Sequence, residues 1–539
     1  MEEKVYSYHT FILPFVWEGS RLGTQTMKEL VKCFESNPFW MNTDLPDEFH
    51  AERGERIRSR QEAVEFYKEY QYFHPFVRRA LYGFADNIVH SYTFMPDDVR
   101  NKAHYYIKKG DNEYDLVVNA VRVRIYNTAV GLFILECENR GIQRNGRRQD
   151  DLDSIKNINE YGRRITLPIL PVPPGYYSMC ADRLSIRVKD GIEFVTDFEE
   201  FAKGLDGDDQ IEGKVLLTYT AGFIKDLLGY GSTVSFTSHP VDRADMFYIY
   251  PALDDRMFVA CWIGQVTETD TLAQGYEGDD PDSIRRSESL YELAFVDPAG
   301  NCSCPNREMR NRLLHDHTYR RWLGDSGSGY NTLYTVAAQV MIGMAYDPKG
   351  FLGHLTESFL TQYIQMCCLA LVQRASLIHF QKIATTLSAH LEDRGVKIGI
   401  STVTKIMNLQ ESFIAFESQL SFREVSPQEQ AIELYDMLSD FMFIEREKAS
   451  LKESLDALYD AANTNLDFSF NKWGGIFAVA ATILTVPVLF SLAGENEEKV
   501  LTLFGREFAV APEWPGILLL VILAAAAGIV MGYHHRRRR

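Results

Sequence analysis

Paired arginines are the residues of this chain whose type and spacing best suit phosphate binding. Arg163 and Arg164 follow Tyr161 at the end of an expected helix over 153–161. Two guanidinium groups at the boundary of an element can each bind a phosphate through two hydrogen bonds, and a tyrosine ring can stack on a base. Asp226, which follows an expected strand, can accept a hydrogen bond from an amine. We therefore predict a ligand site with Arg163, Arg164, Tyr161 and Asp226, with surface or structural ion pairs as the alternative for each.

Two further arginine pairs are weaker candidates for the same chemistry. Arg147 and Arg148 lie in a turn, where a solvated tip is the simpler interpretation. Arg320 and Arg321 precede Trp322 in a later loop and form a third candidate. An interface between subunits would explain any of these clusters equally well.

Two motifs resemble catalytic or metal sites without the context that those sites need. Residues 324–328 (GDSGS) resemble the nucleophile segment of trypsin-like proteases, but that chemistry needs a His and an Asp held by paired β-barrels. Cys302 and Cys304, with His315 and His317, offer four zinc-type side chains. Their spacing lacks the longer gaps of common zinc sites. We therefore expect no enzyme activity and leave a metal site unassigned.

Composition and charge limit the class of the protein. The chain has 539 residues, 46% of them hydrophobic, and a net charge of −18. This is the composition of a folded protein, and its acidic surface disfavours direct binding of nucleic acid. The eight cysteines form no regular framework and no signal peptide precedes them, so we expect reduced cysteines and a cytoplasmic N-terminus.

Two uncharged segments near the C-terminus have the length of membrane spans. Residues 474–494 and 514–533 each supply at least 20 residues, enough to cross about 30 Å of hydrocarbon as a helix. The chain ends in four arginines, Arg536 to Arg539, whereas the intervening loop is acidic. The positive-inside rule then places both termini in the cytoplasm.

A long helix is expected to lead into the first span. Ser426-Pro427-Gln428-Glu429 has the pattern of a capping box, and no further Pro or Gly occurs before Gly474. A helix over 427–493 would be about 100 Å long. A coiled-coil spacing of 4, 3 and 4 favours packing against other copies, although packing on its own domain is the alternative. That seam consists of Leu451, Leu455, Leu458 and Ala462.

The segment before these helices is expected to be a mixed α/β domain. Residues 115–138 indicate a strand pair, because Val121, Val123 and Ile125 alternate with Arg122 and Arg124. We predict an α/β ligand-sensing domain over 1–350, a helical stalk over 351–470 and a two-span membrane domain over 471–539.

The C-terminal part, residues 426–539, resembles the CorA family of magnesium transporters. The resemblance rests on the long helix, on Pro487 within the first span, and on Pro512-Glu513-Trp514 before the second, which is similar to the family's Met-Pro-Glu-Leu loop. It implies a homopentamer in the bacterial inner membrane, with the first span lining a pore. Gly494 and Glu495 stand where the family's Gly-Met-Asn signature is expected, so magnesium selectivity is in doubt.

The resemblance also implies pore residues. Amides and carboxylates at the cytoplasmic mouth, and a carboxylate ring at the outer mouth, would favour cations over anions. A solvated helix end and an acidic loop are the alternatives. The predicted pore residues are Asn463, Asn465 and Asp467, and Glu495, Asn496, Glu497 and Glu498.

Within the family, the plan of the whole chain resembles the CorA-like membrane effectors of type III CRISPR systems. This resemblance implies a channel that is opened by S-adenosyl-methionine joined to AMP (SAM-AMP) and that impairs the membrane on activation. It implies no cofactor, although Mg²⁺ is possible, and no direct nucleic-acid partner. A divalent cation transporter and a membrane-anchored enzyme are the alternatives.

Overall fold

The structure, a computed structural model, describes most of the chain up to residue 464 and two short strands beyond it. The described residues are 6–19, 27–44, 67–83, 87–141, 146–166, 179–198, 221–232, 234–237, 246–264, 277–323, 331–346, 353–392, 400–464, 499–503 and 506–510.

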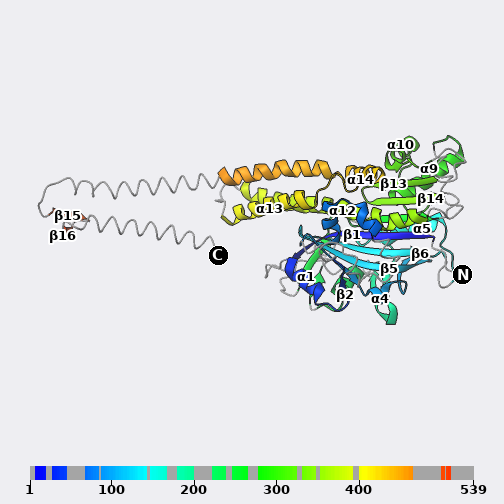
Figure 1. The fold of residues 1–539 in the computed structure, drawn as a ribbon, viewed down its shortest axis with the longest axis horizontal. Coiled ribbons are helices and arrows are strands. Elements are labelled where there is room, and N and C mark those ends of the chain that lie inside the picture. Colours follow the sequence, from blue (N-terminus) through cyan, green and yellow to red (C-terminus); the bar gives the residue numbers. More distant parts are fainter. Residues whose placement is uncertain are drawn as a thin grey trace, which may run out of the picture. The chain divides into compact units, whose positions relative to one another are not determined.

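A sheet of 14 strands, mostly antiparallel, is built from strands between Ser7 and Tyr346 (Figure 1). Its main path runs β12 (Thr318–Tyr319), β13 (Asn331–Ala337), β14 (Val340–Tyr346), β11 (Phe258–Gly264), β1 (Ser7–Gly19), β6 (Val130–Asn139), β5 (Asn112–Tyr126), β4 (Ala103–Lys109), β7 (Arg183–Arg187) and β8 (Glu193–Asp197). Four strands lie off this path: β2 (Trp40–Asn42), β3 (Val89–Phe94), β9 (Ser235–Thr237) and β10 (Met246–Pro251). The parallel pairs are β11 with β14 and β10 with β9.

The strand pair expected over residues 115–138 is confirmed as β5 and β6. The two strands pair antiparallel, with Val123 opposite Phe133, and the turn between them spans residues 127–129. Val121, Val123 and Ile125 are fully buried, as their alternation predicts. Arg124, on the opposite face of β5, is also buried, at 6% exposure. That face is therefore covered by other elements near the turn.

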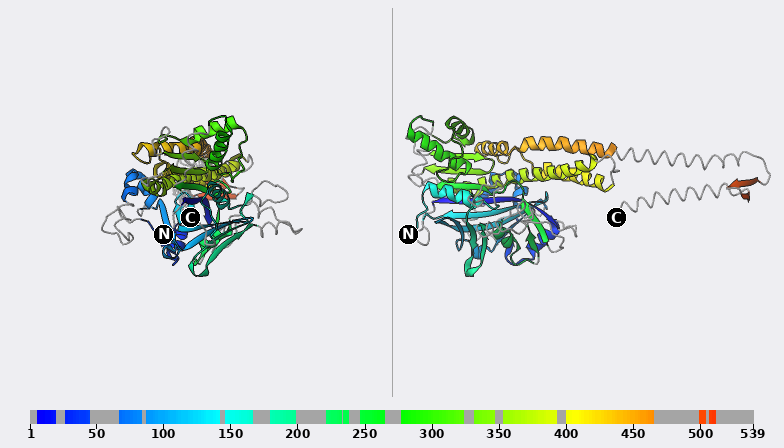
Figure 2. Two further views of the ribbon diagram at one scale, coloured as in Figure 1. Left: turned by 90° about the vertical axis from the view of Figure 1, so that its right-hand side faces the viewer. Right: turned by 180° about the vertical axis from the view of Figure 1, so that it is seen from behind.

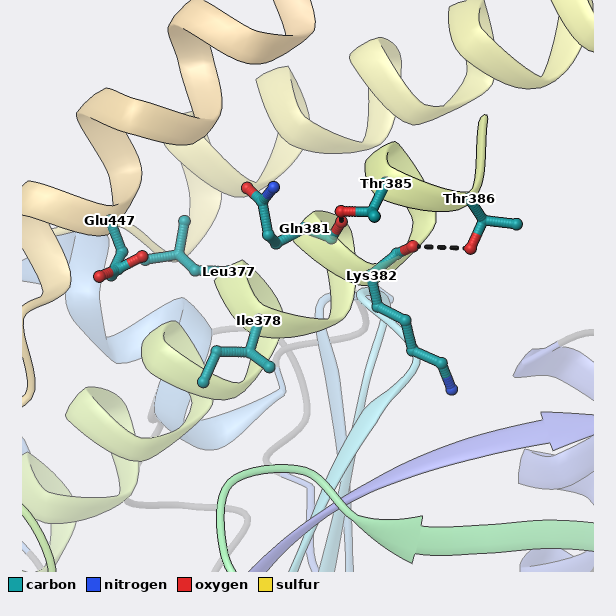
Figure 3. A pocket seen from close by; sticks show the side chains of 7 residues that line it. All are labelled: Leu377, Ile378, Gln381, Lys382, Thr385, Thr386 and Glu447. Atoms are coloured by element: carbon teal, nitrogen blue, oxygen red, sulfur yellow. Dashed lines mark hydrogen bonds between the residues drawn. The ribbon is translucent and has the colours of Figure 1, made fainter. Parts of the chain in front are cut away.

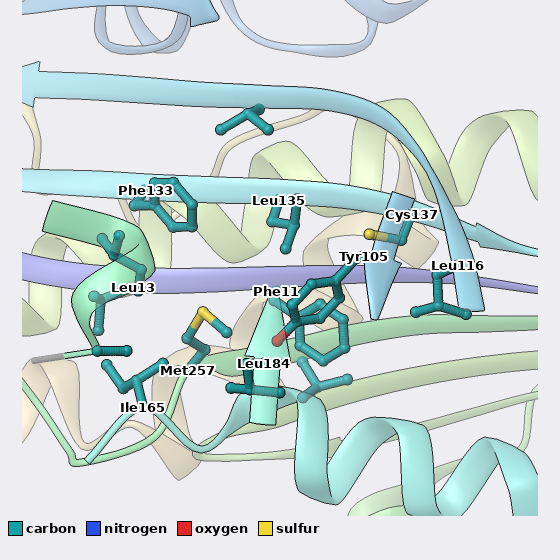
Figure 4. Close-up of a cluster of buried hydrophobic side chains, with 14 of the residues drawn as sticks. Phe11, Leu13, Tyr105, Leu116, Phe133, Leu135, Cys137, Ile165, Leu184 and Met257 are labelled. Atoms are coloured by element: carbon teal, nitrogen blue, oxygen red, sulfur yellow. The ribbon is translucent and has the colours of Figure 1, made fainter. Parts of the chain in front are cut away.

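The main hydrophobic core lies on one face of the sheet (Figure 4). Phe11 and Leu13 of β1 contribute to it with alternate residues of the neighbouring strands, such as Phe133 and Leu135. Helices α5 (Leu152–Arg163), α7 (Gly222–Gly229) and α9 (Pro281–Phe295) pack on this core, and α10 (Arg307–His317) packs on α9. Shorter elements complete this region: α1 (Met27–Glu35), α3 (Pro75–Tyr82), α4 (Pro96–Val99) and the 3₁₀ turn Lys189–Gly191.

The opposite face of the sheet is covered by helices from the C-terminal half of the chain. Helix α12 (Ile364–Glu392) packs on β1 and β6, and α14 (Glu429–Phe441) packs on β13 (Figures 1 and 2). A π-helical turn over Phe359–Tyr363 joins α12 to α11 (Gly353–Ser358). The hydroxyl of Ser376 on α12 lies 2.7 Å from that of Thr128 in the β5–β6 turn, which fixes this helix against the sheet.

The expected uninterrupted helix from residue 427 is wrong in the described part. The helix begins at Glu429; the hydroxyl of Ser426 donates to the carbonyl of Tyr72 and accepts a 3.3 Å hydrogen bond from the backbone N–H of Gln428. It ends at Phe441, and a second helix covers 444–464. Between them Phe443 has a φ of 56°, a left-handed conformation that interrupts the helical hydrogen bonds.

Part of the predicted coiled-coil seam is buried within the chain. Leu451 and Leu455 are at most 2% exposed, and Lys452 beside them pairs with Glu417 of α13 (Ile400–Gln419) at 3.2 Å. The bundle within one chain therefore accounts for these two leucines. A single chain does not test the predicted homopentamer.

The predicted fold, a CorA-like protein with two membrane spans, is wrong for the described residues. None of their helices combines the length and apolar composition needed to cross a membrane. The predicted spans over 474–494 and 514–533 lie outside the described residues. For the described residues, the same finding overturns the predictions of a membrane protein, of an ion channel and of a location in the bacterial inner membrane.

The chain divides into two compact units, which do not coincide with the predicted domains. The first consists of residues 1–395 and 404–456, and holds the large sheet and α12 and α14. The second consists of residues 396–403 and 457–539. Its described part includes a separate antiparallel pair, β15 (Lys499–Leu503) and β16 (Arg506–Val510). The predicted domain boundaries stay predictions.

Candidate functional site

The strongest concentration of ligand-type side chains lies where α5 ends. Asp151 caps the start of this helix, because its carboxylate accepts a hydrogen bond from the backbone N–H of Ser154 at 2.8 Å. The apolar face of α5 packs on β1, β4 and β11. Near its end Gly162 allows close contact: a Cβ there would lie 2.8 Å from both Ile107 and Phe11. This close packing fixes the position of the two arginines that follow.

Both predicted arginines are held by one carboxylate. Glu160 lies 2.8 Å from the guanidinium of Arg163 and 2.6 Å from that of Arg164. The three residues are at most 8% exposed. Burial lowers the pKa of Arg163, and Glu160 opposes that shift by stabilising the charged form. The described state therefore already contains a bound anionic group, and it is part of the chain itself.

The cluster extends to a second set of charges before β11. Asp254 pairs with Arg256 at 2.7 Å, and Asp255 lies 3.3 Å from the same guanidinium. Gln339, in the turn between β13 and β14, donates to Asp254 and accepts a 3.4 Å hydrogen bond from Arg163. A backbone bridge joins Arg164 and Arg256.

These contacts form a closed ring. We name it the arginine ring, and it consists of Glu160, Arg163, Arg164, Asp254, Asp255, Arg256 and Gln339. Three guanidinium groups face three carboxyl groups. Burial, and then the neighbouring Asp254, raise the pKa of Asp255 to about 6. The charge of the ring therefore changes close to neutral pH.

The other predicted ligand residues lie at different distances from the ring. Tyr161 is half-buried beside it, with the ammonium group of Lys109 5.6 Å from the centre of its ring. Asp226 is exposed on α7, which packs on β8 and β9, whereas α5 packs on β1, β4 and β11. The structure therefore places Arg163, Arg164 and Tyr161 together and puts Asp226 on a separate element.

The remaining predicted site residues fall in or after the last described helix. Asn463 is half-buried near the end of the helix over 444–464. Asn465, Asp467, Glu495, Asn496, Glu497 and Glu498 lie outside the described residues. Within the described part of the chain, no group of three or more His, Cys, Asp or Glu side chains is placed to hold a metal ion.

Reasoning from sequence missed most of the ring. The helical spacing of Glu160, three and four residues before the arginines, was a usable signal for ion pairing. Asp254, Asp255 and Gln339 carried no such signal, because they reach Arg163 and Arg164 only through the packing of β11 and the β13–β14 turn beside α5.

A buried polar network beneath α5 has the side-chain order of a hydrolase triad. The hydroxyl of Ser7 lies 2.8 Å from Nε2 of His9, whose Nδ1 lies 2.7 Å from the amide oxygen of Asn159. All three residues are at most 1% exposed, so no substrate reaches the hydroxyl. Burial lowers the pKa of His9 to about 4, which keeps its ring neutral. This network ties α5 to β1.

A groove of about 390 Å³ lies along α12 (Figure 3). Side chains of α12 between Leu377 and Thr386 line it together with Glu447 of the helix over 444–464. Its cation, Lys382, lies 2.9 Å from the hydroxyl of Tyr250 and 3.8 Å from Glu18. The lining therefore offers less positive charge for a phosphate than the arginine ring.

No family model matches the chain, and no curated protein is significantly similar to it. Among solved structures, it is similar to the structure of the full-length CmaX protein, at 12% sequence identity and a TM-score of 0.16. That match covers 51% of this chain and 88% of the other. A similarity at this TM-score carries no argument about fold or function.

Proposed function

We propose that the chain is an effector of type III CRISPR antiviral defence whose α/β part binds the nucleotide messenger SAM-AMP. The arginine ring is the observation that supports this proposal most directly. It brings together three guanidinium groups from two segments of the chain, those of Arg163 and Arg164 and that of Arg256. The two segments meet at the backbone bridge between Arg164 and Arg256. The identity of the messenger rests on the sequence resemblance to CorA-like effectors alone. The proposal assigns no catalytic step to the chain.

A phosphate would bind by exchange with a carboxylate. Glu160 neutralises Arg163 and Arg164 in the described state, each through one of its two oxygens. A phosphate carries more acceptor oxygens than a carboxylate and pairs bidentately with guanidinium groups. It would thus take the place of Glu160, or that of Asp254 and Asp255 on Arg256. The half-buried aromatic side chain of Tyr161 lies next to the arginine ring and offers a surface for the adenine.

Calorimetric titration of the full chain with SAM-AMP tests this proposal. Arg164→Lys is the informative variant, because lysine keeps the charge but loses the planar fork. We expect the wild type to bind and Arg164→Lys to weaken binding at least tenfold.

Arg183→Lys is the matched control, because Arg183 lies on β7 and pairs with Glu193 at the surface. It should bind like the wild type. Equal affinity of the Arg164→Lys variant and the wild type would exclude the arginine ring as the site. No heat of binding with wild type would exclude SAM-AMP as the messenger.

A further inference from the structure

Helix α14 is held along its length by one short segment, residues 317–322, which we call the clamp segment. It begins at His317, the last residue of α10, and contains β12. Clamp side chains contact both the first turns of α14 and its last residue. The clamp segment includes Arg321 and Trp322, which sequence analysis marked only as a possible phosphate site.

The first half of α14 is bound through a polar network. Arg321 lies 2.6 Å from Glu429 and 3.0 Å from Glu433. The hydroxyl of Tyr319 donates to Glu433 at 2.5 Å, and the indole N–H of Trp322 donates to Gln430 at 2.9 Å. Because Arg321 is occupied by two carboxylates of α14, its position in this structure serves the helix rather than a separate anion.

The end of α14 is bound through an aromatic contact. The ring of His317 stacks on Phe441, with ring centres 3.8 Å apart and an angle of 14° between their planes. Nδ1 of His317 also lies 2.7 Å from the backbone carbonyl of Val336 in β13. His317 therefore links the last residue of α14 to the strand beneath it. Two residues later the chain turns at Phe443 and begins the helix over 444–464.

The same strand also leads to the arginine ring. Tyr319 of the clamp segment pairs with Tyr334 of β13. Strand β13 then leads into the turn that carries Gln339, the residue that contacts both Arg163 and Asp254. The clamp segment thus contacts β13 over Tyr334 to Val336, and the turn that follows Ala337 carries the contact with the arginine ring.

We propose that the clamp segment couples occupancy of the arginine ring to the position of α14. That the ligand is SAM-AMP rests on the proposed function, whereas the coupling between the two sites rests on the contacts of β13. A ligand that displaces Glu160 or Asp254 changes the contacts of Gln339. That change shifts the β13–β14 turn, and β12 and Tyr319 move with β13. Coupling of this kind requires an element whose equilibrium both sites bias, and α14 is that element.

The ion pairs between the clamp segment and α14 are weak enough for such coupling. The side chains of Arg321 and Glu429 are 38% and 78% exposed, and exposed ion pairs contribute only about 0–1 kcal/mol each. The network therefore stabilises the observed position of α14 but leaves the helix able to move. Water and salt weaken its ionic part.

Hydrogen exchange of the backbone amides of α14 tests the coupling in the full chain. Arg321→Glu replaces two ion pairs with repulsion, and we expect exchange over residues 429–441 to become at least about threefold faster. Reversing the charges at Glu429 and Glu433 as well should restore slow exchange. Arg187→Glu, which breaks an exposed pair between Arg187 of β7 and Glu193 of β8, is the matched control and should leave α14 unchanged.

A second arm tests transmission without any ligand. Gln339→Ala removes the contacts of the turn with Arg163 and Asp254, and it should change the exchange rate of α14 in the wild-type background. The same substitution should have no effect on α14 once Arg321→Glu has released the clamp. Unchanged exchange of α14 in the Gln339→Ala variant would overturn the proposed coupling.

The ligand arm separates this inference from the proposed function. SAM-AMP should change the exchange of α14 in wild type, and should still bind the Arg321→Glu variant but without changing α14. An equal response of α14 in both proteins would overturn the role of the clamp segment. If wild type does not bind SAM-AMP, the proposed function is wrong, and the Gln339→Ala arm still decides whether β13 couples the two sites.

Discussion

The carboxylate of Glu160 and the guanidinium group of Arg163 form an ion pair of 2.8 Å with side chains that are only 5% and 3% exposed. Arg164 joins the same carboxylate one residue later along the helix. In water such pairs are weak, but inside a protein each charge depends on its partner. The predicted ligand residues are therefore also part of the structural core around α5.

Removing the charge of Glu160 should destabilise the protein strongly. We expect Glu160→Gln to lower the free energy of unfolding by about 3–5 kcal/mol, because two buried guanidinium groups lose their counter-charge. Urea unfolding at pH 7 measures the change.

Glu193 provides a matched control for this substitution. Its carboxylate also forms ion pairs with two arginines, Arg183 and Arg187, but these pairs lie at the surface of β7 and β8. Glu193→Gln should cost no more than about 1 kcal/mol. Equal losses for the two variants would mean that the pairs around Glu160 are as solvated as those at the surface.

Protonation of His9 should reduce stability in mild acid. Burial lowers the pKa of His9 to about 4 in the folded protein, whereas the unfolded chain titrates near 6.5. Between these values the unfolded state binds the proton and the folded state does not, so stability falls as the pH falls from about 6.5 to 4. The full effect is about 3 kcal/mol.

The variant His9→Gln isolates this contribution, because other groups also titrate in the same range. Its amide can bond Asn159 but does not titrate. As the pH is lowered from 7 to 5, the unfolding free energy of the wild type should fall more than that of the variant. A difference that stays constant with pH would show that His9 is not held neutral.

Adding a methyl group at Gly162 should disturb the site more than helix propensity helps it. Alanine stabilises a helix interior by about 1 kcal/mol relative to glycine. At Gly162, however, the new Cβ would lie 2.8 Å from Ile107 and from Phe11. Overpacking costs about 1–3 kcal/mol, so Gly162→Ala should be destabilising overall. Gly353→Ala in α11, where nothing lies within 4 Å, should be neutral or stabilising, and thermal unfolding of both variants compares them.

The left-handed backbone of Phe443 should make its identity measurable in stability. A φ of 56° is unfavourable for a bulky residue, whereas asparagine tolerates it. We expect Phe443→Asn to match or exceed wild type in the free energy of unfolding. Phe443→Val, with a branched Cβ, should lose more than about 1 kcal/mol. The reverse order in urea unfolding would show that the contact of Phe443 with Arg446, at 4.2 Å, outweighs the backbone strain.

Sequence patterns predicted the elements whose residues interact within one element or with the next. The β5–β6 pair follows from the alternation of Val121, Val123 and Ile125. The helix expected over 153–161 is present as Leu152–Arg163. In each case hydrophobic periodicity, capping or turn chemistry lies within the segment itself.

The end of α14 shows where this local reasoning fails. Residues 428–464 contain neither Gly nor Pro, so nothing local predicts a break. The break lies at Phe443, whose φ is 56°, just after Phe441, whose ring stacks on that of His317 from a distant part of the chain. Contacts over such separations compete with helix propensity, and propensity is too small to decide the outcome.

By itself the sequence determined which side chains could carry the chemistry, namely Arg163 and Arg164 beside Tyr161, because residue type and helical spacing are local properties. Only the tertiary structure decided what those side chains do in the folded chain. It brought Asp254, Arg256 and Gln339 to them and left Asp226 on a separate helix. It also covered Arg124, which alternation alone would expose. The physical reason is that burial and ion pairing depend on which distant segments pack against a residue, and that information resides in the whole fold.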